Sequence, residues 1–168
     1  MYETESDIEA LQTLLDRSFA GAGAHLSEIM VPASRLNARQ LVRYLDGVKH
    51  VAFATVTSGG EPRVSPLDST FLWGKFYVGT DGRSFRSRHI RRQPAVSLTH
   101  YRGDEVGVIV HGRAELLESG SEELQRVDAI WTAIYGSSPL SWGEQVVFYR
   151  IEPQRMFTYA PKASEFPE

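Results

Sequence analysis

The chain contains no cysteine among its 168 residues. Disulfides, thiolate metal sites, iron–sulfur centres and a cysteine nucleophile are therefore excluded. No stretch approaches the roughly 18 consecutive apolar residues that cross a membrane. The first ten residues, MYETESDIEA, are acidic and polar, whereas a secretory signal begins basic and then turns apolar. We expect a cytoplasmic protein with no membrane partner.

Several enzyme motifs are missing as well. The five histidines show no HExxH pattern or other i, i+4 spacing, so we predict no metal site. There is no G-x-S-x-G elbow of a serine hydrolase. Gly79 and Gly82 are too few to form a dinucleotide-binding fingerprint. No catalytic residue can be named from a motif.

The composition is that of a folded globular protein, with 42% hydrophobic, 11% aromatic and 23% charged residues. The formal net charge of -3 and the sequence pI near 6.0 argue against a general nucleic-acid binder, which is usually basic over a whole face. Positive charge is concentrated locally, so we expect a small-molecule partner and no nucleic acid.

Residues 1–47 are predicted to form a helical N-terminal extension in two pieces. Ser6 and Glu9 have the spacing of a capping box for the first helix, and Asn37 and Gln40 can cap the second reciprocally. Apolar residues follow the first cap at helical spacing. These are Ile8, Leu11, Leu14, Leu15 and Phe19. We expect both helices to pack on a larger core.

Residues 48–160 switch to strand patterns and are followed by a short tail, 161–168. A helix interrupts the strands, with Ser119 and Glu122 as its expected capping box. Six or seven antiparallel strands with inserted helices predict a Greek-key β-barrel, because a barrel leaves no exposed strand edge. The expected strands are 50–57, 63–73, 76–80, 95–101, 106–118, 145–152 and 155–160, with Pro153 separating the last two.

The stretch GRSFRSRHIRR, residues 82–92, carries five arginines and a histidine. Ser84 can cap a short helix there, with Phe85 and Ile90 as its buried contacts. Arginines near the start of a helix are unfavourable by roughly 0.3–1 kcal/mol each, and a bound anion reverses that effect. Free N–H groups, a serine and guanidinium groups together favour a phosphate site. The alternative is a solvated arginine-rich face paired with acids elsewhere.

Three stretches resemble a known family. Residues 80–98, TDGRSFRSRHIRRQPAVSL, place a threonine, a serine with a following arginine, a short helix and a Val-Ser-Leu strand in the family's order. RVSPL at 63–67 and RIEP at 150–153 are similar to two more of its strands. Over roughly residues 48–160 the chain thus resembles the pyridoxamine 5'-phosphate oxidase-like family, the FMN-binding split barrels. The resemblance implies that fold.

The resemblance also implies a cofactor site. Ser84 and Arg86 would hold the phosphate of FMN, or of a deazaflavin coenzyme as the alternative. The family is typically a homodimer with its sites at the interface, where aromatic residues of the partner, with Trp131 and Trp142 as candidates, would complete each site. The full set of implied cofactor-binding residues is Arg63, Ser65, Pro66, Leu67, Thr80, Ser84, Phe85, Arg86, Arg88 and His89.

The function implied by the resemblance is a flavin-dependent oxidoreductase that transfers a hydride to or from a small organic substrate. In such an enzyme the cofactor carries the hydride chemistry, and the protein supplies position and electrostatics. The C-terminal arginine and histidine that grip pyridoxamine phosphate in the oxidases themselves are not recognisable, so we do not expect that substrate. Alternatives are a deazaflavin-dependent reductase and a non-catalytic module that binds flavin or haem.

Overall fold

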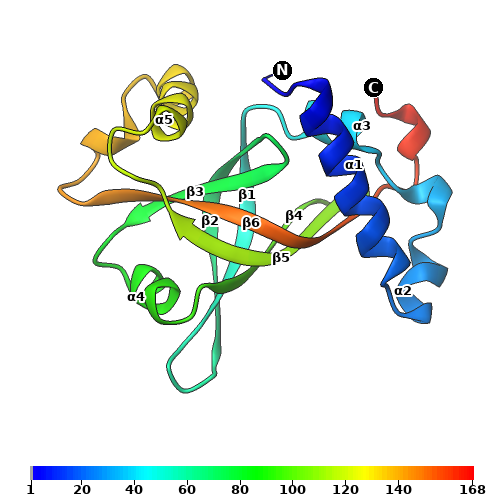
Figure 1. Cartoon of the computed structure of the whole chain (residues 1–168), viewed down its shortest axis with the longest axis horizontal. Coiled ribbons are helices and arrows are strands. Elements are labelled where there is room, and N and C mark those ends of the chain that lie inside the picture. The colour runs from blue at the N-terminus through cyan, green and yellow to red at the C-terminus, as the bar shows by residue number, and fades with distance from the viewer. Residues whose placement is uncertain (1) are drawn as a thin grey trace.

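The structure, a computed structural model, describes residues 2–168 and contains a closed barrel of six antiparallel strands with inserted helices (Figure 1). The strand order around the barrel is β1-β2-β3-β6-β5-β4, and β1 closes it by pairing with β4. The predicted barrel is confirmed. The strands are β1 (Val48–Val56), β2 (Pro62–Leu72), β3 (Lys75–Asp81), β4 (Ala95–Arg102), β5 (Val106–Leu116) and β6 (Val146–Tyr159).

The expected break at Pro153 is wrong, because β6 runs through it as one strand. Proline has no N–H to give to a strand ladder, and a bulge is one of the places where a sheet tolerates it. The register shifts there: Gly112 pairs with Pro153, His111 pairs with Arg155, and Gln154 is left over. A Cβ atom on Gly112 would lie 2.2 Å from the backbone oxygen of Glu152, so this approach requires glycine.

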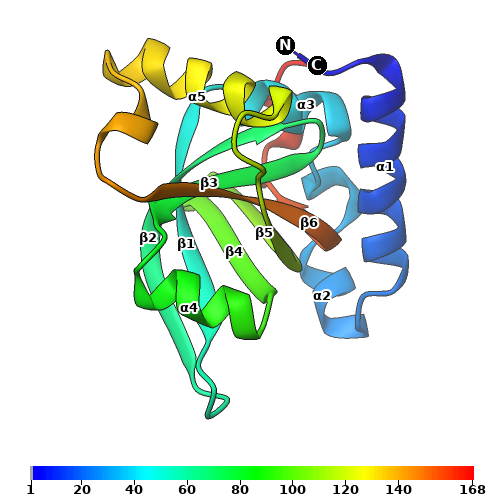
Figure 2. The ribbon, with the colours of Figure 1, turned by 60° about the vertical axis from the view of Figure 1, so that its left-hand side comes forward.

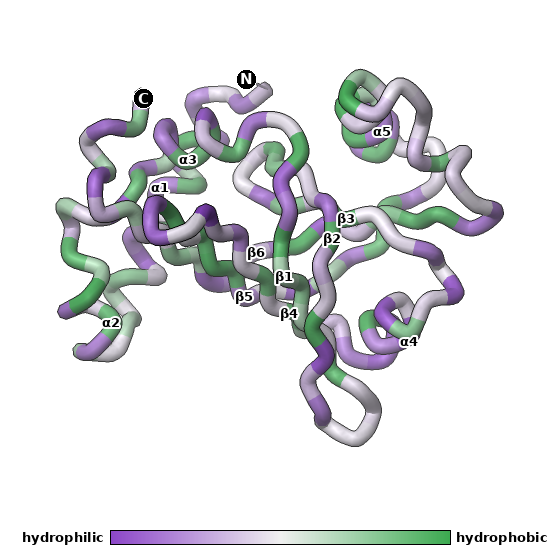
Figure 3. The backbone as a smooth tube through the Cα atoms, turned by 180° about the vertical axis from the view of Figure 1, so that it is seen from behind, coloured by the Kyte–Doolittle hydropathy of each residue, from purple (hydrophilic) through white to green (hydrophobic). Residues whose placement is uncertain are grey.

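The helices gather at two sides of the barrel. Figures 1 and 3 place α1, α2 and α3 at one side and α4 and α5 at the other, while the β1–β2 hairpin projects beyond the barrel near α4. Within residues 2–168, no helix has the length and apolar character needed to cross a membrane. The helices are α1 (Glu5–Ala20), α2 (Ala24–Ile29), α3 (Ala38–Tyr44), α4 (Phe85–Arg92) and α5 (Glu122–Tyr135), with short 3-10 segments at Pro32–Ser34, Pro139–Ser141 and Ala163–Glu165.

The cap of α1 lies two residues before the predicted one. Thr4 is the N-cap, and its side chain accepts a hydrogen bond from the backbone N–H of Asp7 while Asp7 bonds back to Thr4. Ser6 and Glu9 lie inside the helix, so the predicted box is wrong. Both pairs have the same spacing, and the pattern does not distinguish between them.

The cap of α5 is also shifted, whereas that of α3 is confirmed. Ser121 caps α5 by accepting a hydrogen bond from the N–H of the residue three positions later, so the expected box of Ser119 and Glu122 is wrong. Asn37 and Gln40 bond reciprocally at 3.0 Å, as their spacing predicts. Capping chemistry therefore located the helices to within about one turn.

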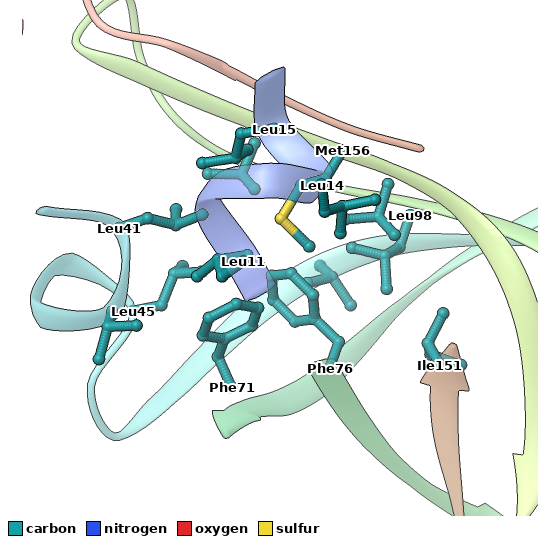
Figure 4. Close-up of a cluster of buried hydrophobic side chains, with 14 of the residues drawn as sticks. Leu11, Leu14, Leu15, Leu41, Leu45, Phe71, Phe76, Leu98, Ile151 and Met156 are labelled. Atoms are coloured by element: carbon teal, nitrogen blue, oxygen red, sulfur yellow. The ribbon is translucent and has the colours of Figure 1, made fainter. Parts of the chain in front are cut away.

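Helix α1 closes one end of the barrel. Figure 4 shows its leucines pointing among Phe71, Phe76 and Met156, side chains that come from three different strands. All belong to one cluster of buried residues that continues through the barrel interior. Burying each leucine contributes roughly 1.5–3 kcal/mol. The leucines are Leu11, Leu14 and Leu15.

Helix α5 packs on the outer face of β3 and β6. Trp131 is buried with its ring edge-on to Phe148 at 5.2 Å between centroids. The hydroxyl of Tyr77 donates to Glu123 at 2.6 Å, and Arg150 of β6 reaches the other oxygen of Glu123 at 2.8 Å. Burial is the main cause that raises the pKa of Tyr77 above its ordinary value, and the bond to Glu123 raises it further. These contacts fix the helix that carries Trp131 next to the site described below.

Candidate functional site

The arginine segment forms α4, which begins where β3 ends. Ser84 is its N-cap and accepts a hydrogen bond from the N–H of Ser87 at 3.1 Å, as predicted. Ser87 is fully buried and donates its hydroxyl proton to the carbonyl oxygen of Asp81 at 2.9 Å. These bonds tie the first turn of α4 to the end of β3. Figure 2 shows α4 below the barrel strands and α5 above them.

Arg86, in the first turn of α4, joins three elements. Its guanidinium donates to Thr80 Oγ1 of β3 at 2.7 Å and to Ser65 Oγ of β2 at 2.6 Å. Its Nε is buried and has no hydrogen-bond partner among residues 2–168. Burial lowers the pKa of Arg86 below its ordinary value. The positive charge is thus held between hydroxyl oxygens, with no carboxylate beside it.

A groove of about 530 Å³ opens over this guanidinium, and we call it the arginine groove. Its lining includes two arginines and a histidine and no carboxylate. Arg63 is paired with Glu61 at 2.6 Å, whereas Arg86 has no such partner, so the chemistry around Arg86 suits an anion. Six of the ten predicted cofactor-binding residues line it. The lining consists of Thr55, Thr57, Arg63, Val64, Ser65, Ser84, Phe85, Arg86 and His89.

Other arginines of the segment have partners in their own chain. Arg83 forms ion pairs with Asp81 at 3.0 Å and with Glu144 at 3.6 Å. The bond from Arg83 holds the pKa of the Asp81 carboxyl below its usual value. Arg91 donates to the carbonyl oxygen of Gly82 at 3.0 Å. These two arginines therefore stabilise the turn before α4 and do not line the groove.

Of the two side chains of α4 that were predicted to be buried, only one is buried. Ile90 is buried, but Phe85 is 73% exposed, because it stands on the groove side of the helix. The guanidinium of Arg88 lies over the Phe85 ring, 4.2 Å from its centroid, and is not part of the groove wall. His89 shares a hydrogen bond of 3.0 Å with Thr55 across to β1.

A second cavity, of about 470 Å³, is connected to the groove through the bond between Thr80 and Arg86, and we call it the tryptophan cavity. Thr80 lines this cavity and also accepts the bond from Arg86. The predicted residues Pro66, Leu67 and Thr80 belong here. The lining consists of His50, Pro66, Leu67, Asp68, Gly79, Thr80, Asp81, Trp131, Pro139, Trp142, Val146 and Phe148.

Sequence reasoning missed the polar group at this cavity. Asp68 Oδ1 lies 2.6 Å from Nδ1 of His50, and its Oδ2 accepts the hydroxyl of Tyr135 at 2.7 Å. Burial is the main cause that raises the pKa of Tyr135, and the bond to Asp68 adds to it, so that the pKa is about 12. The three residues come from β1, β2 and α5, so no local motif links them. Trp131 and Trp142, predicted to reach a partner's site, line a cavity of their own chain.

Comparison with solved structures shows that the fold is widespread. Rv2991, a conserved hypothetical protein from Mycobacterium tuberculosis, is 20% identical with a TM-score of 0.69, covering 83% of this chain and 94% of its own. HutZ, the heme storage protein from Vibrio cholerae, is 20% identical with a TM-score of 0.61, over 74% of this chain and 94% of its own. An FAD-binding protein from Mesorhizobium loti is 23% identical with a TM-score of 0.57, over 73% and 94%.

No curated protein matches this chain in sequence. A family model does, and its match spans both α4 and the strands that form the arginine groove. The model is described as pyridoxamine 5'-phosphate oxidase and covers residues 38–160, which is more than half of the chain. Together with the closed six-stranded barrel, this match shows that the chain belongs to the pyridoxamine 5'-phosphate oxidase-like family of split barrels.

Proposed function

We propose that the chain is a flavin-dependent oxidoreductase and that its arginine groove holds the phosphate of FMN. The observation that carries the proposal is Arg86, a half-buried cation bonded only to neutral hydroxyl groups and left with a buried unpaired Nε. Burying a charge without a counter-charge is unfavourable, and a phosphate in the groove would supply one. The residues present therefore fit the phosphate of the cofactor.

Each predicted binding residue has a role in this proposal, and Ser65 and Thr80 would orient Arg86 by accepting its two hydrogen bonds. Arg86 would pair with the phosphate, and Ser84 would add a hydroxyl beside the N-terminus of α4. Arg63 and His89 would flank the phosphate from opposite walls of the groove. The ribityl chain and ring would follow β2 past Pro66 and Leu67, so that the ring would lie at the edge of the tryptophan cavity and leave the cavity itself open, and Arg88 would support the wall of the groove through Phe85.

When bound, FMN supplies the hydride chemistry. The chain's own residues bind its phosphate, orient the ring against β2 and limit access of water to the cavity. Val64 and Phe85, at the groove, are 66% and 73% exposed although both are large and apolar. Exposed apolar side chains beside a site are typical of an interface, so we propose that a second copy of the chain covers them. Light scattering after size exclusion measures whether the protein is a homodimer.

The first test is an absorbance spectrum from 300 to 500 nm of the purified protein, before and after titration of a dialysed sample with FMN. We expect a flavin band that the protein perturbs, and weaker binding of riboflavin, which lacks the phosphate. A protein that binds neither molecule contradicts the proposal. Anaerobic reduction of the loaded protein by NADH or NADPH then separates an oxidoreductase from a module that binds flavin without turnover.

The same titration with a deazaflavin coenzyme tests the alternative cofactor, which also carries a phosphate on a ribityl chain. Haem binding is the second candidate function, favoured by the likeness to HutZ. Haem carboxylates would also find cations in the arginine groove. An intense Soret band after adding haem, with no response to FMN or the deazaflavin, would favour the haem-binding module.

A further inference from the structure

We propose that the tryptophan cavity binds a planar aromatic molecule that carries no negative charge and presents a hydroxyl or amino group to His50. The inference rests on the proposed function only where it identifies this molecule as the substrate. The binding itself concerns residues of the chain that lie outside the arginine groove. Thr80 of the cavity is bonded to Arg86 of the groove, so a ring in the cavity would lie beside the cofactor.

The walls of the cavity are suited to a flat ring. Trp131 is buried and Trp142 is half exposed, and their ring centroids are 6.4 Å apart with the planes tilted by 48°. Phe148 and Leu67 lie on the same lining. Aromatic side chains stabilise a bound ring through large apolar contact and offset or edge-on packing. A volume of about 470 Å³ lies within the range of small-molecule sites.

The charges at the cavity disfavour an anion. No lysine or arginine lines it, whereas two carboxylates do, those of Asp68 and Asp81. Asp81 is paired with Arg83, but Asp68 has only a histidine and a tyrosine beside it. The arginine groove next to it has the opposite character, with two arginines and no carboxylate. We therefore expect the phosphate of a cofactor to bind in the arginine groove and an uncharged substrate to bind in the tryptophan cavity.

His50 supplies the polar contact. Because a carboxylate only accepts, Nδ1 of His50 carries the proton in its bond to Asp68 Oδ1. In the neutral imidazole Nε2 is then an acceptor, which matches a ligand hydroxyl or amino group. Tyr135 holds the second oxygen of Asp68, so the carboxylate that orients His50 is fixed from two sides. The His50 side chain is 84% exposed, which leaves Nε2 accessible.

The test compares three probes with one ring system: 2-naphthol, 2-methoxynaphthalene and 2-naphthoate. Calorimetry at neutral pH measures their dissociation constants on the unmodified protein, with and without FMN. We expect 2-naphthol to bind best, by roughly two- to tenfold over the methoxy compound, since one neutral hydrogen bond is lost. We expect 2-naphthoate to bind more weakly than either. Stronger binding of the anion, or displacement of 2-naphthol by FMN, would overturn the proposal.

The indole N–H signals in NMR spectra of the protein show where the probe binds. Two of the three tryptophans, Trp131 and Trp142, line the cavity, so 2-naphthol should shift their signals and leave that of Trp73 in place. A shift confined to Trp73, or no shift at saturation, would place the probe elsewhere and refute the inference.

Variants separate this proposal from the proposed function. His50→Ala should abolish the preference for 2-naphthol over 2-methoxynaphthalene, and Trp142→Ala should weaken both probes by about threefold or more. Arg92→Ala, at an exposed residue that lines neither site, should leave the binding of all three probes unchanged. If FMN fails to bind while the naphthol results hold, only the proposed function fails. An intact preference in His50→Ala would refute the role of His50.

Discussion

The variant Arg86→Ala should bind FMN more weakly while its stability stays close to that of the unmodified protein. In the folded protein Arg86 makes two bonds to neutral hydroxyl groups, at 2.6 and 2.7 Å, and is half-buried without a counter-charge. Losing those bonds destabilises the protein, whereas removing the desolvated charge stabilises it. Because each effect is about 1–2 kcal/mol, we expect the free energy of unfolding to change by less than about 1 kcal/mol.

The affinity for FMN should change far more. A hydrogen bond between charged groups contributes about 1.5–3 kcal/mol, so losing the phosphate contact should weaken binding by about 2 kcal/mol. That loss corresponds to roughly a 30-fold rise in the dissociation constant. Fluorescence titration measures it, because flavin fluorescence responds to binding. Riboflavin has no phosphate, so its affinity should be the same for the variant and the unmodified protein.

Arg92→Ala is the matched control. Arg92 lies on the same helix, is exposed and does not line the arginine groove. We expect its FMN affinity to stay within about twofold of the unmodified protein, because surface substitutions away from a site change free energies by less than about 0.5 kcal/mol. If Arg86→Ala binds FMN as tightly as Arg92→Ala does, the phosphate lies elsewhere and the reasoning from the uncompensated charge is wrong.

Three further predictions concern the scaffold. Gly112→Ala would place a Cβ atom 2.2 Å from a backbone oxygen, so it should lower the free energy of unfolding by about 3 kcal/mol, as measured by urea denaturation. The control is Gly107→Ala on the same strand, where the space around the glycine is open. Tyr77→Phe removes a 2.6 Å bond to Glu123 and should lower it by about 1.5 kcal/mol. Burial lowers the pKa of His100, so the free energy of unfolding should fall as the pH drops below about 6.5, where the unfolded chain takes up the proton. His100→Gln should make the free energy of unfolding less dependent on pH in this range, and an unchanged dependence would show that His100 is not its cause.

Local patterns in the sequence determined most of the secondary structure. Apolar residues at helical spacing located α1, and alternation with β-branched residues located the strands, because these periods follow from which side chains face the core. The caps at Asn37 and Ser84 could be named because capping uses residues three apart. At α1 two overlapping pairs fit the same rule, and the structure shows that Thr4 is the cap.

The break expected at Pro153 shows what a local rule omits. Proline usually ends a strand because it cannot donate to the ladder. In β6 the bulge opposite Gly112 takes up the irregularity, and that pairing joins residues about forty positions apart. The sequence contains both residues but does not show that they meet.

For the candidate site, the sequence by itself determined that positive charge gathers at the start of α4 and that Ser84 and Arg86 belong together, since both lie within one helical turn. Only the tertiary structure decided that Arg86 has no counter-charge, because its neighbours Ser65 and Thr80 come from two different strands. It also decided that His50 and Asp68 face the tryptophan cavity. Those contacts join residues distant in sequence, and chain closure into a barrel brings them together.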